Sequence, residues 1–218
     1  MLDNIRYNKA FTEKLLFKNY DENDLEMQFK KEFIQYRNSW DSLPNYLVKN
    51  KYSNERMQKE GIMPLCLDIE TASICDLACP FCFREYTATP DKIIDEDVCY
   101  NLIDQAAKMK IPSIKFNWRG EPLLHPKLSN FILYAKKQGI LETIINTNAT
   151  NLTQELSEKL IDSGLDFMIY SFDGGTKETY EKMRPGRFKD NSFEKVYSNI
   201  RNFSQIKKRK NSKFPYTK

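Results

Sequence analysis

Three cysteines stand within eight residues, in the segment Cys75-Asp-Leu-Ala-Cys79-Pro-Phe-Cys82. Three thiolates on one short loop can bind one soft metal centre, whereas a closed four-ligand site needs a fourth donor. The two other cysteines are distant in sequence, because Cys66 lies nine residues before the loop and Cys99 lies seventeen after it. The spacing therefore predicts a [4Fe–4S] cluster that is held by three cysteines and leaves one iron open for another ligand.

Three further motifs follow this loop, each after a predicted strand. They are Arg119-Gly120-Glu121-Pro122, Asn146-Thr147-Asn148-Ala149 and Ser171-Phe172-Asp173-Gly174. The cysteine spacing, the aromatic Phe81 before the last cysteine and the order of the motifs resemble the radical S-adenosylmethionine (SAM) enzymes. The resemblance covers roughly residues 61–211 and is greatest to the subgroup that usually carries a C-terminal SPASM extension. Four motifs in order are more specific than the cysteine spacing alone.

The resemblance implies a set of cofactor contacts. In the family, the open iron takes the amino and carboxylate groups of SAM, and a Gly-Gly-Glu segment meets the amino group. Here Arg119 replaces the first of these glycines, so its role stays open. We expect Gly120 to let a ligand approach its backbone closely. Arg184, with Arg187 as the alternative, is expected to pair with the SAM carboxylate. The expected cofactor-binding residues are Phe81, Gly120, Glu121, Asn148, Ser171, Asp173 and Arg184, and for several of them a turn or capping role is the alternative.

The resemblance also implies a reaction. An external electron donor of flavodoxin or ferredoxin type reduces the cluster, and SAM is cleaved to methionine and a 5′-deoxyadenosyl radical. This radical takes a hydrogen atom from the substrate, whose identity the sequence does not indicate. No catalytic residue is expected beyond the cluster and SAM, since the protein orients the cofactor and excludes solvent.

Two other classes of protein remain possible from the residues alone. A simple iron–sulfur electron carrier would need a fourth cysteine ligand and would have no use for the three later motifs. A zinc-binding structural module would also need a closed four-ligand site. Iron, sulfide and zinc contents after anaerobic reconstitution distinguish these classes from a radical SAM enzyme.

The composition is that of an ordinary globular chain, with 218 residues, 40% of them hydrophobic and 29% charged. Thirty-four basic and thirty acidic residues leave a net charge of +4, which is too small to indicate a nucleic-acid partner. We expect no membrane span and no signal peptide. An odd number of cysteines, three of them clustered, is typical of a reducing compartment, so a cytoplasmic protein is expected.

Alternating strands and helices predict an α/β fold from residue 61 onward. Strands are expected at residues 63–70, 113–118, 142–148 and 167–172, with helices at 95–109, 127–138, 153–163 and 176–183. A further helix is expected to start at Asn191, with Glu194 completing a capping box. This pattern predicts a partial parallel (β/α) barrel of radical SAM type. It has only about four strand–helix units, so the core at 61–218 is expected to be C-terminally incomplete, with an open edge at the fourth strand.

The predicted strands alternate between a polar and an apolar face. The polar set includes Asp68 and Glu70 on the first strand, Lys115 and Asn117 on the second and Asn146 on the third, while Met168 on the fourth strand belongs to the apolar set. We expect the opposite charges of Asp68, Glu70 and Lys115 to pair. The other face of the second strand carries Ile114, Phe116 and Trp118. A polar interior of this kind predicts a lumen that binds something polar.

Residues 1–60 are predicted to form a helical extension. Apolar side chains at helical spacing indicate a helix over 22–40 that Pro44 ends, followed by a second helical piece at 45–60. We expect the stripe to pack on the following domain rather than to act as a lid or partner surface. Its members are Leu25, Phe29, Phe33, Tyr36 and Trp40.

A few reactive or charged residues are given structural roles. His125, the only histidine, is expected to pack at the start of a helix rather than to bind metal. Cys66 and Cys99 are expected to be inert thiols. The basic run 207–210 is expected to end a helix rather than to bind RNA.

Overall fold

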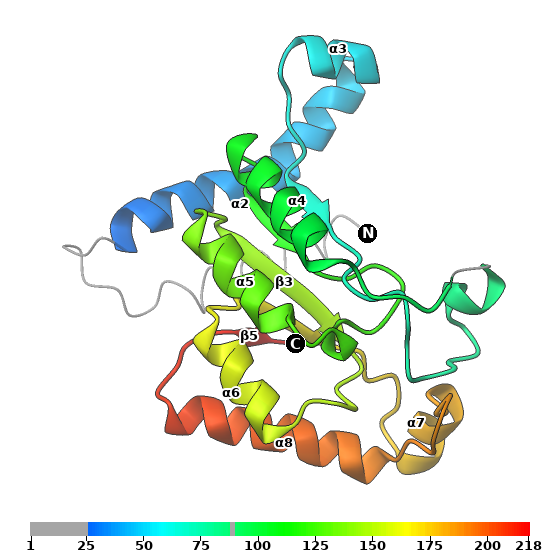
Figure 1. Cartoon of the computed structure of the whole chain (residues 1–218). Helices are drawn as coiled ribbons and strands as arrows, with labels where there is room; N and C mark the ends of the chain where they lie inside the picture. The colour runs from blue at the N-terminus through cyan, green and yellow to red at the C-terminus, as the bar shows by residue number, and fades with distance from the viewer. Residues whose placement is uncertain (1–25, 88–89) are drawn as a thin grey trace. The chain divides into compact units, whose positions relative to one another are not determined.

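The computed structural model describes residues 26–87 and 90–218 (Figure 1). The chain divides into two compact units, the first ending at Leu65 and the second spanning Cys66–Lys218. Within these described residues, no helix is both long and apolar enough to cross a membrane.

The first unit contains α2 (Glu26–Lys49) and α3 (Asn54–Lys59). The prediction that Pro44 ends the first helix is wrong, because α2 continues through it. A proline removes one backbone donor, and helical bonding resumes after it, as the bond from Asn50 N–H to Tyr46 C=O shows. The ring of Tyr36 makes edge contacts with Phe33 at 5.8 Å and Trp40 at 6.4 Å. Leu25 and the side chain of Phe29 lie outside the described residues, so packing of the whole stripe on the following domain stays a prediction.

The second unit is built on a five-stranded parallel sheet in the order β1-β2-β3-β4-β5. Four strand–helix units are followed by one more strand than the sequence predicted. This fifth strand pairs with β4, so the edge of β4 that was predicted to be open is partly covered. The strands are β1 (Cys66–Asp68), β2 (Ser113–Lys115), β3 (Glu142–Thr147), β4 (Phe167–Tyr170) and β5 (Tyr216–Thr217).

Five helices connect the strands, and most begin with a side-chain cap. The predicted start of the last helix is wrong by one residue, since Ser192 is the cap and accepts from the backbone N–H of Lys195. The side chain of Asn191 instead donates to the Tyr180 hydroxyl and the Arg184 carbonyl. The helices are α4 (Glu96–Lys108), α5 (Leu128–Lys137), α6 (Gln154–Asp162), α7 (Lys177–Met183) and α8 (Phe193–Arg209), with short 3₁₀ turns η1 (Phe83–Tyr86) and η2 (Pro122–Leu124).

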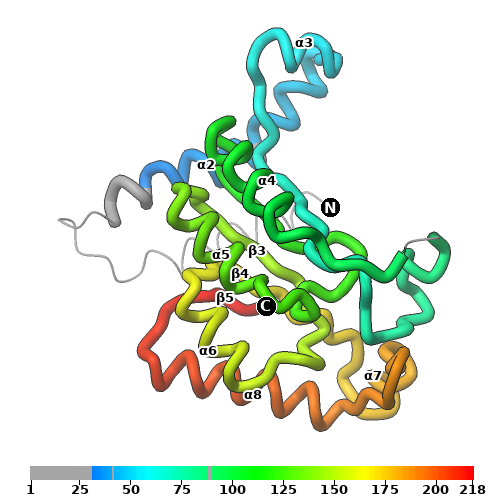
Figure 2. Tube along the Cα trace, viewed as in Figure 1, coloured from blue at the N-terminus to red at the C-terminus, as the bar shows by residue number. Residues whose placement is uncertain are grey.

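The hydrophobic core lies between the sheet and the helices α4, α5, α6 and α8, which follow one another along the sheet (Figures 1 and 2). Ile114, Phe116 and Met168 are fully buried in this core, as the strand alternation predicted. Trp118 is the exception, with 63% of its surface exposed. Because β2 ends at Lys115, the alternation of faces does not extend to residue 118. Because the helices cover the apolar face of the sheet, its polar face is available for the site described next.

Candidate functional site

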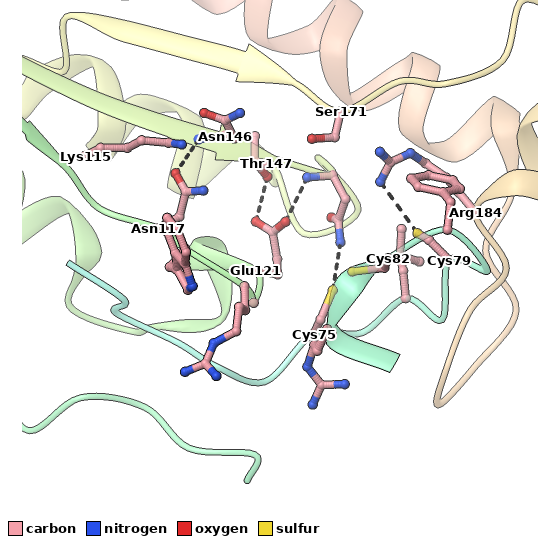
Figure 3. A pocket seen from close by; sticks show the side chains of 17 residues that line it. Cys75, Cys79, Cys82, Lys115, Asn117, Glu121, Asn146, Thr147, Ser171 and Arg184 are labelled. Atoms are coloured by element: carbon pink, nitrogen blue, oxygen red, sulfur yellow. Dashed lines mark hydrogen bonds between the residues drawn. The ribbon is translucent and has the colours of Figure 1, made fainter. Parts of the chain in front are cut away.

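The three clustered cysteines line one cavity of about 230 Å³ (Figure 3). Their loop follows β1 and is joined to the segment after α7 by backbone hydrogen bonds. The N–H of Ala78 donates to Pro185 C=O at 2.9 Å, and the N–H of Arg187 donates to Asp76 C=O at 2.8 Å. The cysteine loop is therefore held by the segment after α7 as well as by the strand that precedes it.

The thiols lie in a partly dry environment. Cys79 is buried, while Cys75 and Cys82 are half-buried. Burial raises the pKa of Cys75 to about 12. Burial also raises the pKa of Cys79, although the Arg184 guanidinium, whose Nη1 donates to Cys79 Sγ at 3.7 Å, lowers it in part. The Cys75 and Cys79 thiols stay protonated in the free protein, so metal binding would displace their protons.

The donors suit a cluster better than one ion. In the part of the chain that the structure describes, no three His, Cys, Asp or Glu side chains converge closely enough to hold a single metal ion. Three sulfur donors are instead spread around one cavity. Soft thiolate ligands select iron–sulfur clusters and other soft centres. The residues present therefore fit a cluster held by Cys75, Cys79 and Cys82.

Asp76 connects this loop to the end of β3, a role that the sequence analysis missed. Its carboxylate accepts from Asn148 Nδ2 at 2.8 Å, from Asn151 Nδ2 at 3.2 Å and from the Thr150 hydroxyl. The same Asn148 amide lies 3.9 Å from Cys75 Sγ. The signal in the sequence was a carboxylate between two cysteines of the loop, which indicated a role for Asp76 in the site. Its hydrogen-bond partners could not be predicted from the sequence.

Glu121 joins the loop after β2 to the end of β3. The residue is only 3% exposed. Its carboxylate accepts from Thr147 Oγ1 at 2.6 Å, Asn148 N at 2.7 Å and Leu123 N at 3.1 Å. Burial raises the pKa of Glu121 to about 7, in spite of these three donors. The side chain both lines the cavity and organises its wall.

Close packing requires a glycine at position 120, in addition to the reason predicted from the sequence. A Cβ atom at this position would lie 2.1 Å from the carbonyl oxygen of Ala72 and 2.6 Å from that of Ile74. The neighbouring N–H of Glu121 donates to the same Ile74 oxygen at 2.9 Å. The absent side chain thus permits close packing on the backbone that leads into Cys75. Gly120 also lines the cavity, and the expectation that it lets a ligand approach its backbone stays a prediction.

Arg184 lies between the cysteine loop and the segment after β4. Its Nε donates to Asp173 Oδ2 at 2.7 Å, its Nη2 contacts the same oxygen, and its Cζ lies 5.6 Å from the centroid of the Phe81 ring. Phe81, Ser171 and Arg184 line the cavity, whereas Asp173 does not. Arg187 pairs with Asp91 at 2.9 Å and is also outside the cavity lining. The cavity therefore gathers every predicted cofactor-binding residue except Asp173.

Arg119 pairs with Glu70, so the predicted pairing of Glu70 with Lys115 is wrong. The guanidinium donates from Nε and Nη2 at 3.0 and 2.7 Å, and the Arg119 backbone N–H donates to the same carboxylate at 3.0 Å. A planar guanidinium matches two carboxylate oxygens better than an ammonium does. Asp68 forms no ion pair with Lys115 either within the described residues. The cavity lining further includes Lys115, Asn117 and Asn146, which the strand alternation placed on the polar face but which were not named as site residues.

The remaining reactive residues have structural surroundings. His125 is buried, its Nδ1 accepts from the N–H of Lys127 at 3.1 Å, and its Nε2 lies 3.1 Å from the Ile94 carbonyl oxygen. It therefore packs before α5, as predicted. Cys99 is fully buried in the hydrophobic core, and the Sγ of Cys66 lies 3.7 Å from an oxygen of Asp68.

Comparison with known proteins decides the family. Residues 69–214 match the profile of the Radical SAM superfamily. The chain belongs to this superfamily of enzymes. A tungsten-containing aldehyde ferredoxin oxidoreductase cofactor-modifying protein from Pyrococcus furiosus is 32% identical over 49% of this chain and 30% of its own length. A GTP 3′,8-cyclase from Chlorobaculum tepidum is 33% identical over 55% of this chain and 36% of its own.

The fold has relatives among solved structures. One of them is SuiB from Streptococcus suis, a SPASM-type member, in a structure bound to S-adenosylmethionine. It has a TM-score of 0.57 at 22% identity, and the match covers 82% of this chain and 42% of the SuiB chain. The predicted partial radical SAM barrel is confirmed, and so are the [4Fe–4S] cluster and SAM as the cofactors of the superfamily. The chain spans about a third of the length of the curated relatives named here.

Proposed function

We propose that Cys75, Cys79 and Cys82 hold a [4Fe–4S] cluster and that SAM binds beside it in the same cavity. The observation that carries the proposal is the shared cavity, because the three thiols and the segments after β2, β3 and β4 all line it. Parallel α/β proteins bind ligands at the carboxyl ends of their strands. The chain's role is then hydrogen abstraction from a substrate.

Each neighbouring side chain has a group to offer SAM. The buried Glu121 carboxylate, with three donors already bound, is an acceptor for the SAM ammonium. Arg184 uses Nε and Nη2 on Asp173, which leaves Nη1, next to Cys79, for the SAM carboxylate. Ser171 supplies a hydroxyl at the end of β4. Asp173 then acts by orienting Arg184 rather than by touching SAM.

When bound, the reduced cluster and SAM supply a 5′-deoxyadenosyl radical that removes hydrogen from the substrate. The electron must come from an external donor of flavodoxin or ferredoxin type. Phe81 and Phe83, which flank Cys82, are 50% and 67% exposed. The cysteine loop therefore reaches the surface of its unit, where an electron donor can approach it.

The alternative functions explain less of the site. An electron carrier or a zinc module would use the cysteine loop alone. Neither explains why Glu121 is buried against the end of β3 or why Asn148 connects that end to the loop through Asp76. A SAM-binding cavity accounts for both.

Anaerobic reconstitution of single cysteine variants tests the proposal. We expect Cys75→Ala, Cys79→Ala and Cys82→Ala each to lose most of the iron and sulfide, since a cluster with one open iron cannot spare a ligand. Cys66→Ala is the matched control, because its half-buried thiol lies outside the cavity. SAM binding is then measured by calorimetry on the reconstituted wild type. Full iron loading of Cys79→Ala, or zinc in place of iron, would contradict the proposal.

A further inference from the structure

Lys115 is a cation of the cavity wall without an anionic partner. Four basic side chains line the cavity, and three of them are paired: Arg84 with Asp91, Arg119 with Glu70 and Arg184 with Asp173. Lys115, the fourth, makes no ion pair or side-chain hydrogen bond within residues 26–87 and 90–218. Its nearest acidic neighbour in the ladder is Asp68, its register partner on β1, which lies outside the cavity lining and accepts from Cys66 instead.

Asn146 adds an unsatisfied polar atom to the same wall. Its Oδ1 is buried and has no hydrogen-bond partner among the described residues. Its backbone N–H donates to Asn117 Oδ1 at 2.8 Å, which holds the Asn117 side-chain amide against the backbone of Asn146. A buried acceptor without a donor destabilises the free protein. A ligand that donates a hydrogen bond would remove this penalty.

These three residues form one group. Lys115 is the last residue of β2 and Asn117 follows two residues later, and Asn146 lies opposite them on β3. Figure 3 shows the amine end of Lys115 directed toward Asn117 and Asn146, with the three cysteines at the other end of the cavity. The group offers an ammonium, amide donors and one free acceptor.

We propose that Lys115, Asn117 and Asn146 form a substrate subsite for an anionic group, a carboxylate or a phosphate, that has a hydroxyl or N–H donor beside it. The inference rests on the proposed function, since it assigns this end of the cavity to the substrate and the cysteine end to SAM. The ammonium binds the anion, and the Asn146 oxygen accepts from the neighbouring donor. The separation in the cavity is the reason to assign the anion to the substrate, because Arg184 already stands beside Cys79 for the SAM carboxylate.

Anion binding to the whole chain tests this subsite without knowledge of the substrate. Malonate and inorganic phosphate are titrated by calorimetry into the metal-free and the reconstituted protein, with malonamide as the neutral probe. We expect one or both anions to bind the wild type and malonamide not to bind. Lys115→Met should weaken anion binding at least about tenfold, whereas Lys115→Arg should stay within about threefold, because loss of one close charge is worth more than 1 kcal/mol.

Two further variants keep the result interpretable. Lys108→Met removes an exposed lysine at the end of α4 that does not line the cavity, and it should leave anion binding unchanged. Asn146→Asp keeps the side-chain shape but places a carboxylate next to Lys115, so it should weaken anion binding as Lys115→Met does. It serves as the decisive variant if Lys115→Met fails to fold.

The outcomes separate the two proposals. If the wild type binds neither anion, or if Lys115→Met binds them as well as Lys108→Met does, the subsite does not exist. If Lys115→Met weakens SAM binding as much as anion binding, the lysine belongs to the SAM site and the inference is overturned. If the wild type assembles no cluster, the proposed function fails, while the titration of the metal-free chain still reports on the subsite.

Discussion

Asp166 and Lys115 lie on opposite faces of the same sheet, in polar groups of opposite character. Asp166 precedes β4 at the amino ends of the strands and accepts from Lys136 Nζ at 2.8 and 3.0 Å, and from the N–H and hydroxyl of Thr143 at 2.7 and 2.9 Å. The same ammonium also donates to the Leu141 carbonyl at 2.9 Å. Lys115, the last residue of β2, has no such partners in the described chain, and Asn146 beside it has a buried oxygen that is unbonded.

The difference shows how one sheet serves stability on its helix-covered face and function on its polar face. A saturated buried group holds its neighbours in one arrangement, and its partners leave no free donor for a ligand. An unsatisfied group weakens the free protein but gains a partner when a ligand binds. Asp166 also precedes β4, whereas the segments after β2, β3 and β4 line the cavity. This agrees with the general rule for parallel barrels, in which the amino ends stabilise the fold and the carboxyl ends carry the site.

The largest effect is expected at the carboxyl ends, from Gly120→Ala. The added methyl group would collide with the backbone oxygens of Ala72 and Ile74, which cannot move away as a flexible side chain could. We expect a loss of unfolding free energy on the order of 5 kcal/mol together with loss of iron loading, because the displaced segment leads into Cys75. Urea denaturation and iron analysis measure the two.

Gly175→Ala is the matched control for this substitution. A Cβ atom at Gly175 meets no atom within 4 Å, so its effect should be within about 0.5 kcal/mol. Normal iron loading in Gly120→Ala would show that the close contact with the backbone before Cys75 is not needed to form the site.

The next effect is expected at the amino ends, from Asp166→Ala. Removal of this largely buried carboxylate leaves the Lys136 ammonium and the Thr143 N–H without their acceptor, which should lower the unfolding free energy by about 3–5 kcal/mol. Iron loading and SAM affinity per folded molecule should stay unchanged. Asp162→Ala, which breaks the exposed pair with Lys210, should change the stability by at most about 1 kcal/mol. A loss of SAM affinity in Asp166→Ala would break the division between the two ends.

The sequence predicted which residues lie on the polar face better than it predicted which side chains contact one another. Strand alternation placed Lys115 and Asn117 on the polar face, and both line the cavity. It could not decide that Glu70 pairs with Arg119, since two cations were within reach and only geometry selects between them. Motif order placed Arg184 near the cysteines but did not show Asp173 holding it, because the pair closes across α7. Local chemistry is readable from residue type and spacing, whereas the choice among possible partners depends on the fold.

The position of Pro44 illustrates a second limit. Proline usually ends a helix because it removes a donor and crowds the preceding turn. In α2 the helix nevertheless continues to Lys49. A propensity is a local preference of a few kcal/mol at most, and bonds on either side of the proline can outweigh it.

The smallest effect sharpens the comparison between two buried carboxyl groups, Glu121 in the cavity and Asp166 at the other end. Burial raises the pKa of both, but Asp166 has the Lys136 ammonium to oppose the shift, whereas Glu121 has only neutral donors and reaches a pKa of about 7.

Below pH 4.5 Glu121 is protonated in the folded and the unfolded chain. As the pH rises toward 7, the unfolded chain releases this proton while the folded chain keeps it, so stability falls. Above pH 7 both forms are ionised and the loss is constant. The unfolding free energy of the metal-free wild type, minus that of Glu121→Gln, should therefore decrease by about 3 kcal/mol between pH 4.5 and 7. Urea denaturation at several pH values measures this difference, and the subtraction cancels every other titrating group. A difference that stayed flat, or rose, across this range would show that the hydrogen bonds from Thr147 and Asn148 keep Glu121 ionised at its ordinary pKa.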